Sequence, residues 1–258
     1  MKVAIYGTCQ NEEANVEQWL KTTADADYRV VCDTGSSDRT VRLFEDAFWE
    51  NTDDQLFHIR IEPFRSDDSR NTAMALVPGD ADVCINLDMD ETLQPGWREA
   101  LEKHWKPGVT RGEYLYIWSH KPDGSPDFQF ITNNRVHSRH GFRFKHPAHE
   151  AIQLSITHEQ NTVHLPGFVI EQFQGKPKNH PRDKELLEVL AWGQWEDPTS
   201  TRMMFYYGRE LMYNRYWKEA LGMFNQYLKL EHENLNERAQ AIEYRANCIR
   251  SMSSLNAG

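Results

Sequence analysis

Two aspartates spaced two residues apart follow an apolar run and form the strongest chemical signal in the chain. The run Val83–Leu87 leads directly into Asp88 and Asp90. If this run is a strand, its side chains alternate, so both carboxylates point to one side at its carboxyl end. Neighbouring carboxylates repel each other unless a cation lies between them, and Mg²⁺ and Mn²⁺ bridge carboxylates to phosphates. The pattern predicts a metal–diphosphate site; a solvated turn after a core strand is the alternative.

Strand and helix patterns alternate around these aspartates. Strands are expected at residues 2–7, 28–33, 55–62 and 82–87, and helices at 12–22, 39–49, 66–76 and 95–105. Strict alternation indicates a mainly parallel sheet with helices on its faces. Ligands of such sheets bind outside the carboxyl ends of the strands. Asp33, at the end of the second strand, and Asp88 and Asp90, after the fourth, are all expected there.

The second half of the chain no longer shows alternating strand and helix patterns. Strands at 113–119 and 128–136 flank the turn 122–126 and predict an antiparallel hairpin that covers the site. Short strands and loops are expected over 141–175. Helices are expected from Pro181 onward, at 203–213, 217–230 and 236–249, with a frayed tail at 251–258. Gly208, Ala220 and Phe224 match the small and aromatic positions of about one and a half tetratricopeptide repeats.

Composition narrows the classes of protein that this chain can represent. It has 258 residues, 39% hydrophobic and 26% charged, which is globular. A net charge of −10 argues against holding nucleic acid by bulk electrostatics. No apolar run approaches a membrane span, and the N-terminus does not resemble a signal peptide. Four scattered cysteines contain no Cys-x-x-Cys pair, which favours a reducing cytoplasm over zinc or redox chemistry.

Five segments, in order, resemble the motifs of family 2 glycosyltransferases of the GT-A fold. They are Asn11–Glu13, Val31–Thr40 (VCDTGSSDRT), Asp68–Ala73, Asp88–Glu91 and His146–Glu150 (HPAHE). The last resembles the His-Glu motif of a bacterial and phage-type branch in which tetratricopeptide-like helices follow. The resemblance covers roughly residues 1–230 and implies a GT-A domain at 1–178 and a helical tetratricopeptide-like extension at 179–258.

The resemblance also implies roles for individual residues. The nucleotide-sugar donor, usually a uridine diphosphate sugar, is expected to contact Asp33 with its base and Asp88 with its ribose or a metal-bound water. Asp90 is the expected ligand of Mn²⁺ or Mg²⁺, with His149 as a second protein ligand. Glu150 is the expected base that takes a proton from the acceptor. The full set of expected donor contacts is Thr8, Asn11, Glu12, Asp33, Arg70, Asp88 and Arg135.

Several residues have structural alternatives. Asp33 and Asp38 are also candidate helix caps, and capping is the preferred interpretation of Asp38. Arg70 is equally consistent with a surface ion pair to Asp67 or Glu62. His149 has the alternative of a hydrogen-bonded structural histidine. The base has alternatives in Asp68 and Glu91.

A basic segment within this acidic chain has no fold-level explanation. Residues 128–149 contain no Asp or Glu but carry Arg135, Arg139, Arg143 and Lys145. One interpretation is that this segment binds the donor diphosphate, with Arg135 as the first candidate, or binds an anionic acceptor. A basic face balanced by the acidic helices is the other.

The sequence therefore predicts a metal-dependent glycosyltransferase that acts by direct displacement, with inversion at the sugar carbon. A nucleotidyltransferase and a non-enzymatic nucleotide-sugar-binding module remain alternatives. The acceptor is open: protein, glycan, lipid-linked sugar or modified nucleic-acid base. Because so few repeats cannot bury their own apolar faces, the C-terminal helices are expected to pack on the catalytic domain, on a second copy of the chain or on a missing continuation. Self-association through these helices is thus one of three options.

Overall fold

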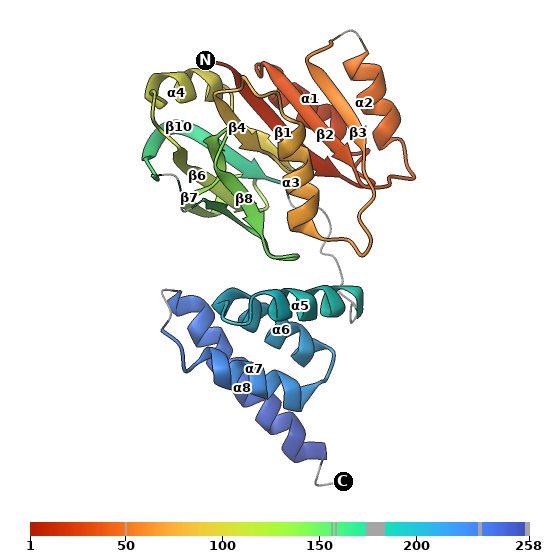
Figure 1. Ribbon diagram of the computed structural model, residues 1–258, viewed down its shortest axis with the longest axis vertical. Coiled ribbons are helices and arrows are strands. Elements are labelled where there is room, and N and C mark those ends of the chain that lie inside the picture. The colour runs from red at the N-terminus through yellow and green to blue at the C-terminus, as the bar shows by residue number, and fades with distance from the viewer. Residues whose placement is uncertain (50, 156, 158, 174–183, 232–233, 256–258) are drawn as a thin grey trace. The chain divides into compact units, whose positions relative to one another are not determined.

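The computed structural model describes residues 1–49, 51–155, 157, 159–173, 184–231 and 234–255. They form two compact units, and each is described by itself (Figure 1). The first comprises Met1–Ile61, Asp67–Lys145 and Ala151–Lys178, and the second comprises Glu62–Ser66, His146–Glu150 and Asn179–Gly258. The predicted domain boundary after residue 178 lies outside the described residues.

The first unit is built on an eight-stranded sheet with the order β3-β2-β1-β4-β7-β6-β10-β5 (Figure 1). Its strands are β1 (Val3–Cys9), β2 (Tyr28–Asp33), β3 (Asp54–His58), β4 (Val83–Asn86), β5 (Glu91–Leu93), β6 (Arg111–His120), β7 (Pro126–Ser138) and β10 (Thr162–Gln172). Strands β1 to β4 pair in parallel, and β10 is parallel to β6, whereas β7 is antiparallel to both β4 and β6. The carboxyl ends of β1, β2, β3, β4, β6 and β10 therefore share one edge of the sheet.

Helices cover the sheet because its alternating side chains make both faces apolar. One face packs against α1 (Val16–Thr22), α2 (Thr40–Phe48) and α4 (Trp97–His104), whose Trp19, Phe44 and Trp97 are buried. The other face packs against α3 (Ser66–Leu76) and a two-stranded sheet of β8 (Phe142–Lys145) and β9 (Ala151–Leu154). Cys9, Cys32 and Cys84 are free thiols buried in this core, as expected of small hydrophobes.

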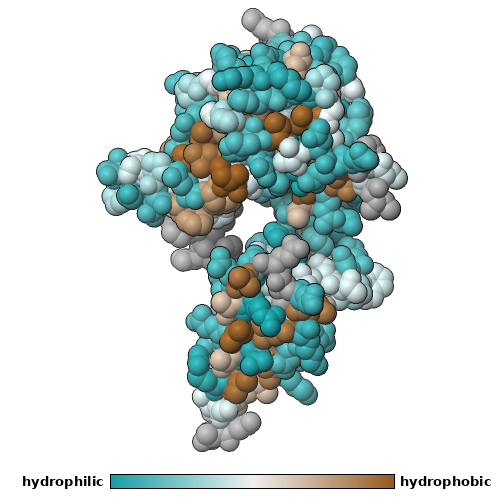
Figure 2. Space-filling view, turned by 90° about the vertical axis from the view of Figure 1, so that its left-hand side faces the viewer, coloured by the Kyte–Doolittle hydropathy of each residue, from teal (hydrophilic) through white to brown (hydrophobic). Residues whose placement is uncertain are grey.

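The second unit contains α5 (Lys184–Glu196), α6 (Thr201–Tyr213), α7 (Trp217–Tyr227) and α8 (Leu235–Leu255). Its core includes Phe205, Ala220, Phe224 and Cys248. Gly208 lets α6 approach α7 closely, because a Cβ there would lie 3.1 Å from both Met223 and Phe224. In the view of Figure 2, hydrophilic residues cover most of the surface of the first unit, with hydrophobic patches among them, and the second unit shows residues of both kinds.

The structure confirms the mixed α/β fold and most predicted elements, with four corrections. The hairpin of β6 and β7 forms, but it lies inside the main sheet, where β7 pairs with β4, rather than as a separate cover. β3 ends at His58, four residues earlier than predicted. β10 is an eleven-residue strand where short strands and loops were expected. Residues 251–255 continue α8 instead of fraying. No described helix combines the length and apolarity that crossing a membrane requires.

Candidate functional site

The paired aspartates lie in a turn and not on a strand. β4 ends at Asn86, and β5 begins at Glu91, so Asp88 and Asp90 occupy the connection between them. The turn is closed by two bonds, from the Glu91 amide to the Asp88 carbonyl (3.1 Å) and from the Asp88 amide to Glu91 Oε2 (2.8 Å). The predicted position at the carboxyl edge is right, but strand alternation is the wrong reason for it.

Asp88 is neutralised by two arginines. Arg70 Nη1 donates to Asp88 Oδ1 at 2.6 Å, and Arg135 Nη2 donates to Asp88 Oδ2 at 2.6 Å. Both guanidiniums also donate to Asn86 Oδ1. Burial alone would raise the pKa of Asp88, but the charges of Arg135 and Arg70 outweigh it and hold that pKa well below its usual range. Arginines, not a cation shared with Asp90, thus balance the charge of Asp88.

Glu91 lies beneath this pair and is fully buried. Its Oε1 accepts hydrogen bonds from Tyr116 Oη and Arg135 Nη2, both at 2.6 Å. Burial raises the pKa of Glu91; Arg135 lowers it, and the neighbouring Asp88 charge raises it again. Asp88 is bonded to two guanidiniums while Glu91 shares one with Asp88, which explains why the pKa of Asp88 is lowered and that of Glu91 is raised. A buried, fully bonded carboxylate is poorly placed to serve as the base considered for it.

Asp90 differs from both neighbours because no arginine among the described residues bonds to it. Gln172 Nε2 donates to its Oδ2 at 3.0 Å, and the Phe173 amide donates to its carbonyl at 2.8 Å. Within the described residues, its Oδ1 accepts no hydrogen bond. Those residues also contain no group of three or more His, Cys, Asp or Glu side chains that could enclose a metal ion. Asp90 alone suits Mg²⁺ or Mn²⁺ held mainly by substrate phosphates, which commonly use one or two carboxylates.

The expected nucleotide corner is formed by the loops that follow β1 and β2. Asp33 is 3% exposed, and its carboxylate accepts bonds from the amides of Gly35 (3.0 Å) and Ser36 (3.1 Å). Asn11 has a left-handed φ of 56°, and its Oδ1 accepts from the Ser37 amide at 2.8 Å. These bonds fasten the two loops together. Asp33 orders its own turn, and its contact with a nucleobase stays a prediction.

Other predicted residues of this corner also have structural contacts. The Glu12 amide donates to Thr40 Oγ1 at 2.7 Å, and Glu12 Oε2 accepts from Asn15. Thr8 is half-buried in β1 opposite Cys32. Asp38 accepts from the amide of Thr40, the first residue of α2, at 2.9 Å. The N-cap position itself is Arg39, whose side chain forms no capping bond, so the capping interpretation of Asp38 stays a prediction.

His149 and Glu150 belong to the second unit. The His149 ring stacks on Tyr206 with centroids 3.8 Å apart, and its Nε2 accepts from Arg209 at 2.9 Å. His146 and His149 both have positive φ, at 81° and 54°, which is uncommon for residues other than glycine. The roles predicted for His149 and Glu150 remain predictions.

The basic segment does not form one surface. Arg135 enters the site, whereas Arg139 donates to the carbonyls of Ala75, Val77 and Pro78 at the end of α3. Arg143 and Lys145 lie on the exposed face of β8. The interpretation as a donor grip therefore applies to Arg135 alone.

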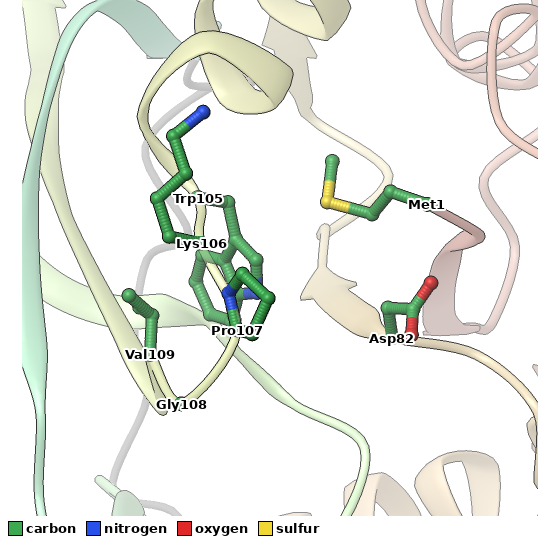
Figure 3. Close-up of a pocket in the computed structure, with 7 residues that line it drawn as sticks. All are labelled: Met1, Asp82, Trp105, Lys106, Pro107, Gly108 and Val109. Carbon is green, nitrogen blue, oxygen red and sulfur yellow. The ribbon is translucent and has the colours of Figure 1, made fainter.

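Two pockets lie at opposite edges of the sheet. One, of about 390 Å³, is lined by Met1 and Asp82 on one side and by the 105–109 loop on the other (Figure 3). It lies where β1 and β4 begin, away from the aspartates. The other, of about 380 Å³, lies at the carboxyl ends of β6 and β10. It is lined by Ser119, His120, Lys121, Pro122, Gly124, Gln172 and Phe173. Because Gln172 and Phe173 both bond to Asp90, this second pocket adjoins the aspartate turn.

Comparison with known proteins decides the family. The model of Glycosyl transferase family 2 matches residues 7–162, more than half of the chain. The chain belongs to glycosyl transferase family 2. It is therefore a glycosyltransferase, and the predicted fold and enzyme class are confirmed. No curated protein matches the sequence significantly.

Solved structures support the fold of this family 2 enzyme. The crystal structure of S. aureus TarS 1-349 is 12% identical, with a TM-score of 0.53 over 98% of this chain and 92% of that one. A longer S. aureus TarS structure is 10% identical, with a TM-score of 0.55 over 97% of this chain and 55% of that one. At such identities the likeness shows the GT-A fold alone.

Four residues of the site escaped prediction or were assigned differently. Asn86, Tyr116 and Gln172 were not singled out, and Glu91 was considered only as a base. Asn86 is polar within an otherwise apolar strand, which was a usable signal. Tyr116 and Gln172 reach the site only because β6 joins the sheet beside β7 and β10 joins it beside β6, and nothing local in the sequence reveals that pairing.

Proposed function

We propose that this glycosyltransferase moves a sugar from a nucleotide-diphosphate donor, a uridine diphosphate sugar, with a divalent ion at Asp90. The observation that carries the proposal is the contrast within one turn. Asp88 is neutralised by Arg70 and Arg135, while Asp90 keeps an oxygen that no described residue occupies. A Mg²⁺ or Mn²⁺ ion bound there supplies positive charge to the departing diphosphate.

The surrounding residues have complementary tasks in this proposal. Arg70 and Arg135 place two guanidiniums beside the expected diphosphate, and such groups bind phosphate oxygens in a fixed planar geometry. Gln172 orients Asp90 through its amide. The loops that contain Asn11 and Asp33 are joined by hydrogen bonds, and they hold the nucleobase of the donor in place.

We place the acceptor at the pocket beside Asp90, lined by His120, Lys121 and Phe173 among others. It opens at the same edge of the sheet as the aspartates, as ligand sites of such sheets do. Direct displacement with inversion, Glu150 as the base and His149 as a second metal ligand remain part of the proposal. The candidate acceptor classes are a protein, a glycan and a modified nucleic-acid base, and transfer assays with each class distinguish them.

The change Asp90→Asn tests the proposal. It removes the negative charge but keeps the shape and the bond to Gln172. We expect the Mn²⁺-dependent rise in melting temperature with uridine diphosphate, and Mn²⁺-stimulated sugar transfer, to be lost while the variant stays folded. Asp53→Asn, on an exposed loop, is the control. Full Mn²⁺ stimulation in Asp90→Asn would refute the metal role, and release of pyrophosphate from uridine triphosphate supplied with a sugar phosphate would indicate a nucleotidyltransferase.

A further inference from the structure

The second unit carries a cluster of two arginines and two aromatic rings. Arg202, Tyr206 and Arg209 lie on one face of α6, at spacings of four and three residues. The guanidinium carbons of Arg202 and Arg209 lie 5.3 and 4.7 Å from the centroid of the Tyr206 ring. Both arginines are half-buried, so the aromatic ring holds two cations close to each other.

His149 ties the two arginines together. Arg202 Nε donates to the His149 carbonyl at 2.5 Å, and Arg209 Nη2 donates to the His149 ring at 2.9 Å. A guanidinium only donates, so His149 Nε2 must accept and carries no proton in this arrangement. The left-handed backbone at His149 is held in place by both arginines.

The two arginines of this cluster have no carboxylate bonded to them within the part of the chain that the structure describes. Among the described residues, neither Arg202 nor Arg209 forms an ion pair with a carboxylate, and Arg209 Nε is buried without an acceptor. Arg65 in the same unit differs, since both of its terminal nitrogens bond to Glu196. One carboxylate reaches the ring, because Glu237 accepts from Tyr206 Oη at 3.3 Å.

We propose that Arg202 and Arg209 form a phosphate-binding site on the second unit, with Tyr206 and His149 fixing the two guanidiniums. A phosphate monoester can carry two negative charges and match two cations, whereas a carboxylate carries one. Planar guanidiniums also bind phosphate oxygens through paired N–H groups. The phosphate belongs either to the sugar donor or to another substrate, and the chemistry of the site is the same in both cases.

Titration calorimetry of the full chain at low salt, without divalent metal, tests this site. The probes are orthophosphate, glycerol 3-phosphate and uridine diphosphate, with acetate as a singly charged comparison. We expect orthophosphate to bind, and Arg202→Gln or Arg209→Gln to weaken it about tenfold or more, as expected for loss of a charged hydrogen-bonding group. Arg209→Lys keeps the positive charge but loses the planar guanidinium, so its affinity for orthophosphate should lie between those of the unmodified protein and Arg209→Gln. Arg250→Gln, an exposed arginine of α8, should bind as the unmodified protein does.

The outcomes separate the sources of the phosphate. If saturating uridine diphosphate displaces orthophosphate, the donor supplies the phosphate; if both bind together, another substrate does. Equal orthophosphate affinity in Arg202→Gln, Arg209→Gln and Arg250→Gln, or no orthophosphate binding, would overturn the proposal, as would equal binding of acetate. Asp90→Asn should leave orthophosphate affinity unchanged, so this test is independent of the proposed metal role.

Discussion

Three carboxylates within four residues are handled in three different ways. Asp88 is paired with arginines, Glu91 is buried and shared between Tyr116 and Arg135, and Asp90 faces an amide. Removing one partner from a buried ionic group costs about 3–5 kcal/mol, because it leaves an uncompensated charge. The residues around Asp90 are therefore held in place independently of any ligand.

A buried histidine beside this site predicts how stability depends on pH. His137 is 1% exposed; its Nε2 lies 2.8 Å from Tyr6 Oη, and its Nδ1 lies 2.7 Å from the Ser138 carbonyl. Burial lowers the pKa of His137 to about 4 from its usual 6.5. Between these values the unfolded chain binds a proton that the folded chain does not. Stability from this residue is thus present above pH 6.5 and is lost as the pH falls toward 4.

The change His137→Phe should remove this pH dependence. We expect the unmodified protein to lose up to about 3 kcal/mol more than the variant between pH 7 and pH 4. Urea denaturation at several pH values measures the difference. His104→Phe, at the last residue of α4, is the matched control. Parallel curves for His137→Phe and the unmodified protein would contradict the assignment.

Sequence reasoning at this scale succeeded where chemistry is local. Asp33, Asp88 and Asp90 were placed at the correct edge, because the ends of strands are encoded within a few residues. The partners of Asp88 were not foreseen as a set, since Arg70 comes from α3 and Arg135 from β7, 18 and 47 residues away. Only the pairing of β7 with β4 brings Arg135 to the turn.

The strands position the site through close contact of their backbones. β1 and the end of β4 approach so closely that a Cβ at Gly7 would overlap the carbonyl oxygen of Leu87. Leu87 directly precedes Asp88, and its amide bonds to the Tyr6 carbonyl at 3.0 Å. The position of the aspartate turn therefore depends on the absence of a side chain in the neighbouring strand.

The change Gly7→Ala should displace this turn. We expect a loss of about 1–3 kcal/mol in the free energy of unfolding, typical of overpacking, together with weaker binding of uridine diphosphate with Mn²⁺. Chemical denaturation and calorimetry measure the two effects. Gly79→Ala is the matched control, because nothing lies within 4 Å of its added Cβ. Similar stability of the two variants would show that β1 and the turn are not coupled in this way.

Local patterns predicted most elements, and pairing between distant strands was the part that they did not reveal. The bounds of β2 and α3 were predicted to the residue, since apolar periodicity and turn residues mark them. The hairpin of β6 and β7 was recognised from its turn, but its insertion beside β4 depends on contacts about 50 residues apart. Sequence periodicity carries no information on which neighbour a strand selects.

At the scale of the whole molecule, α8 presents a second apolar stripe. One face of α8 buries Ala241 and Cys248 in the helical core. Leu235, Ile242 and Ile249, spaced seven residues apart, are 74%, 50% and 48% exposed. Heptad spacing is typical of helices that pack against another helix. The structure thus supplies a candidate surface for the self-association that the incomplete repeats suggested.

We expect the protein to self-associate through this stripe, and the double change Ile242→Asp with Ile249→Asp to shift it toward monomer. Buried charges without partners oppose helix pairing, so the apparent mass should fall at equal concentration. Sedimentation velocity measures the distribution. Leu230→Asp, a partly exposed leucine outside α8, should leave it unchanged. A monomeric unmodified protein at high concentration would refute the expectation.

The internal pairing of Asp88 with Arg70 and Arg135 separates folding from metal binding, two events that many metalloproteins combine. Where carboxylates lie close together without such counter-charges, the protein folds only when a metal ion binds between them, and a chelator unfolds it. In this protein, arginine side chains of the chain itself neutralise the carboxylate of Asp88. In the proposed reaction, the supply of divalent ion would then govern how often the enzyme turns over, while its shape persists through periods of scarcity.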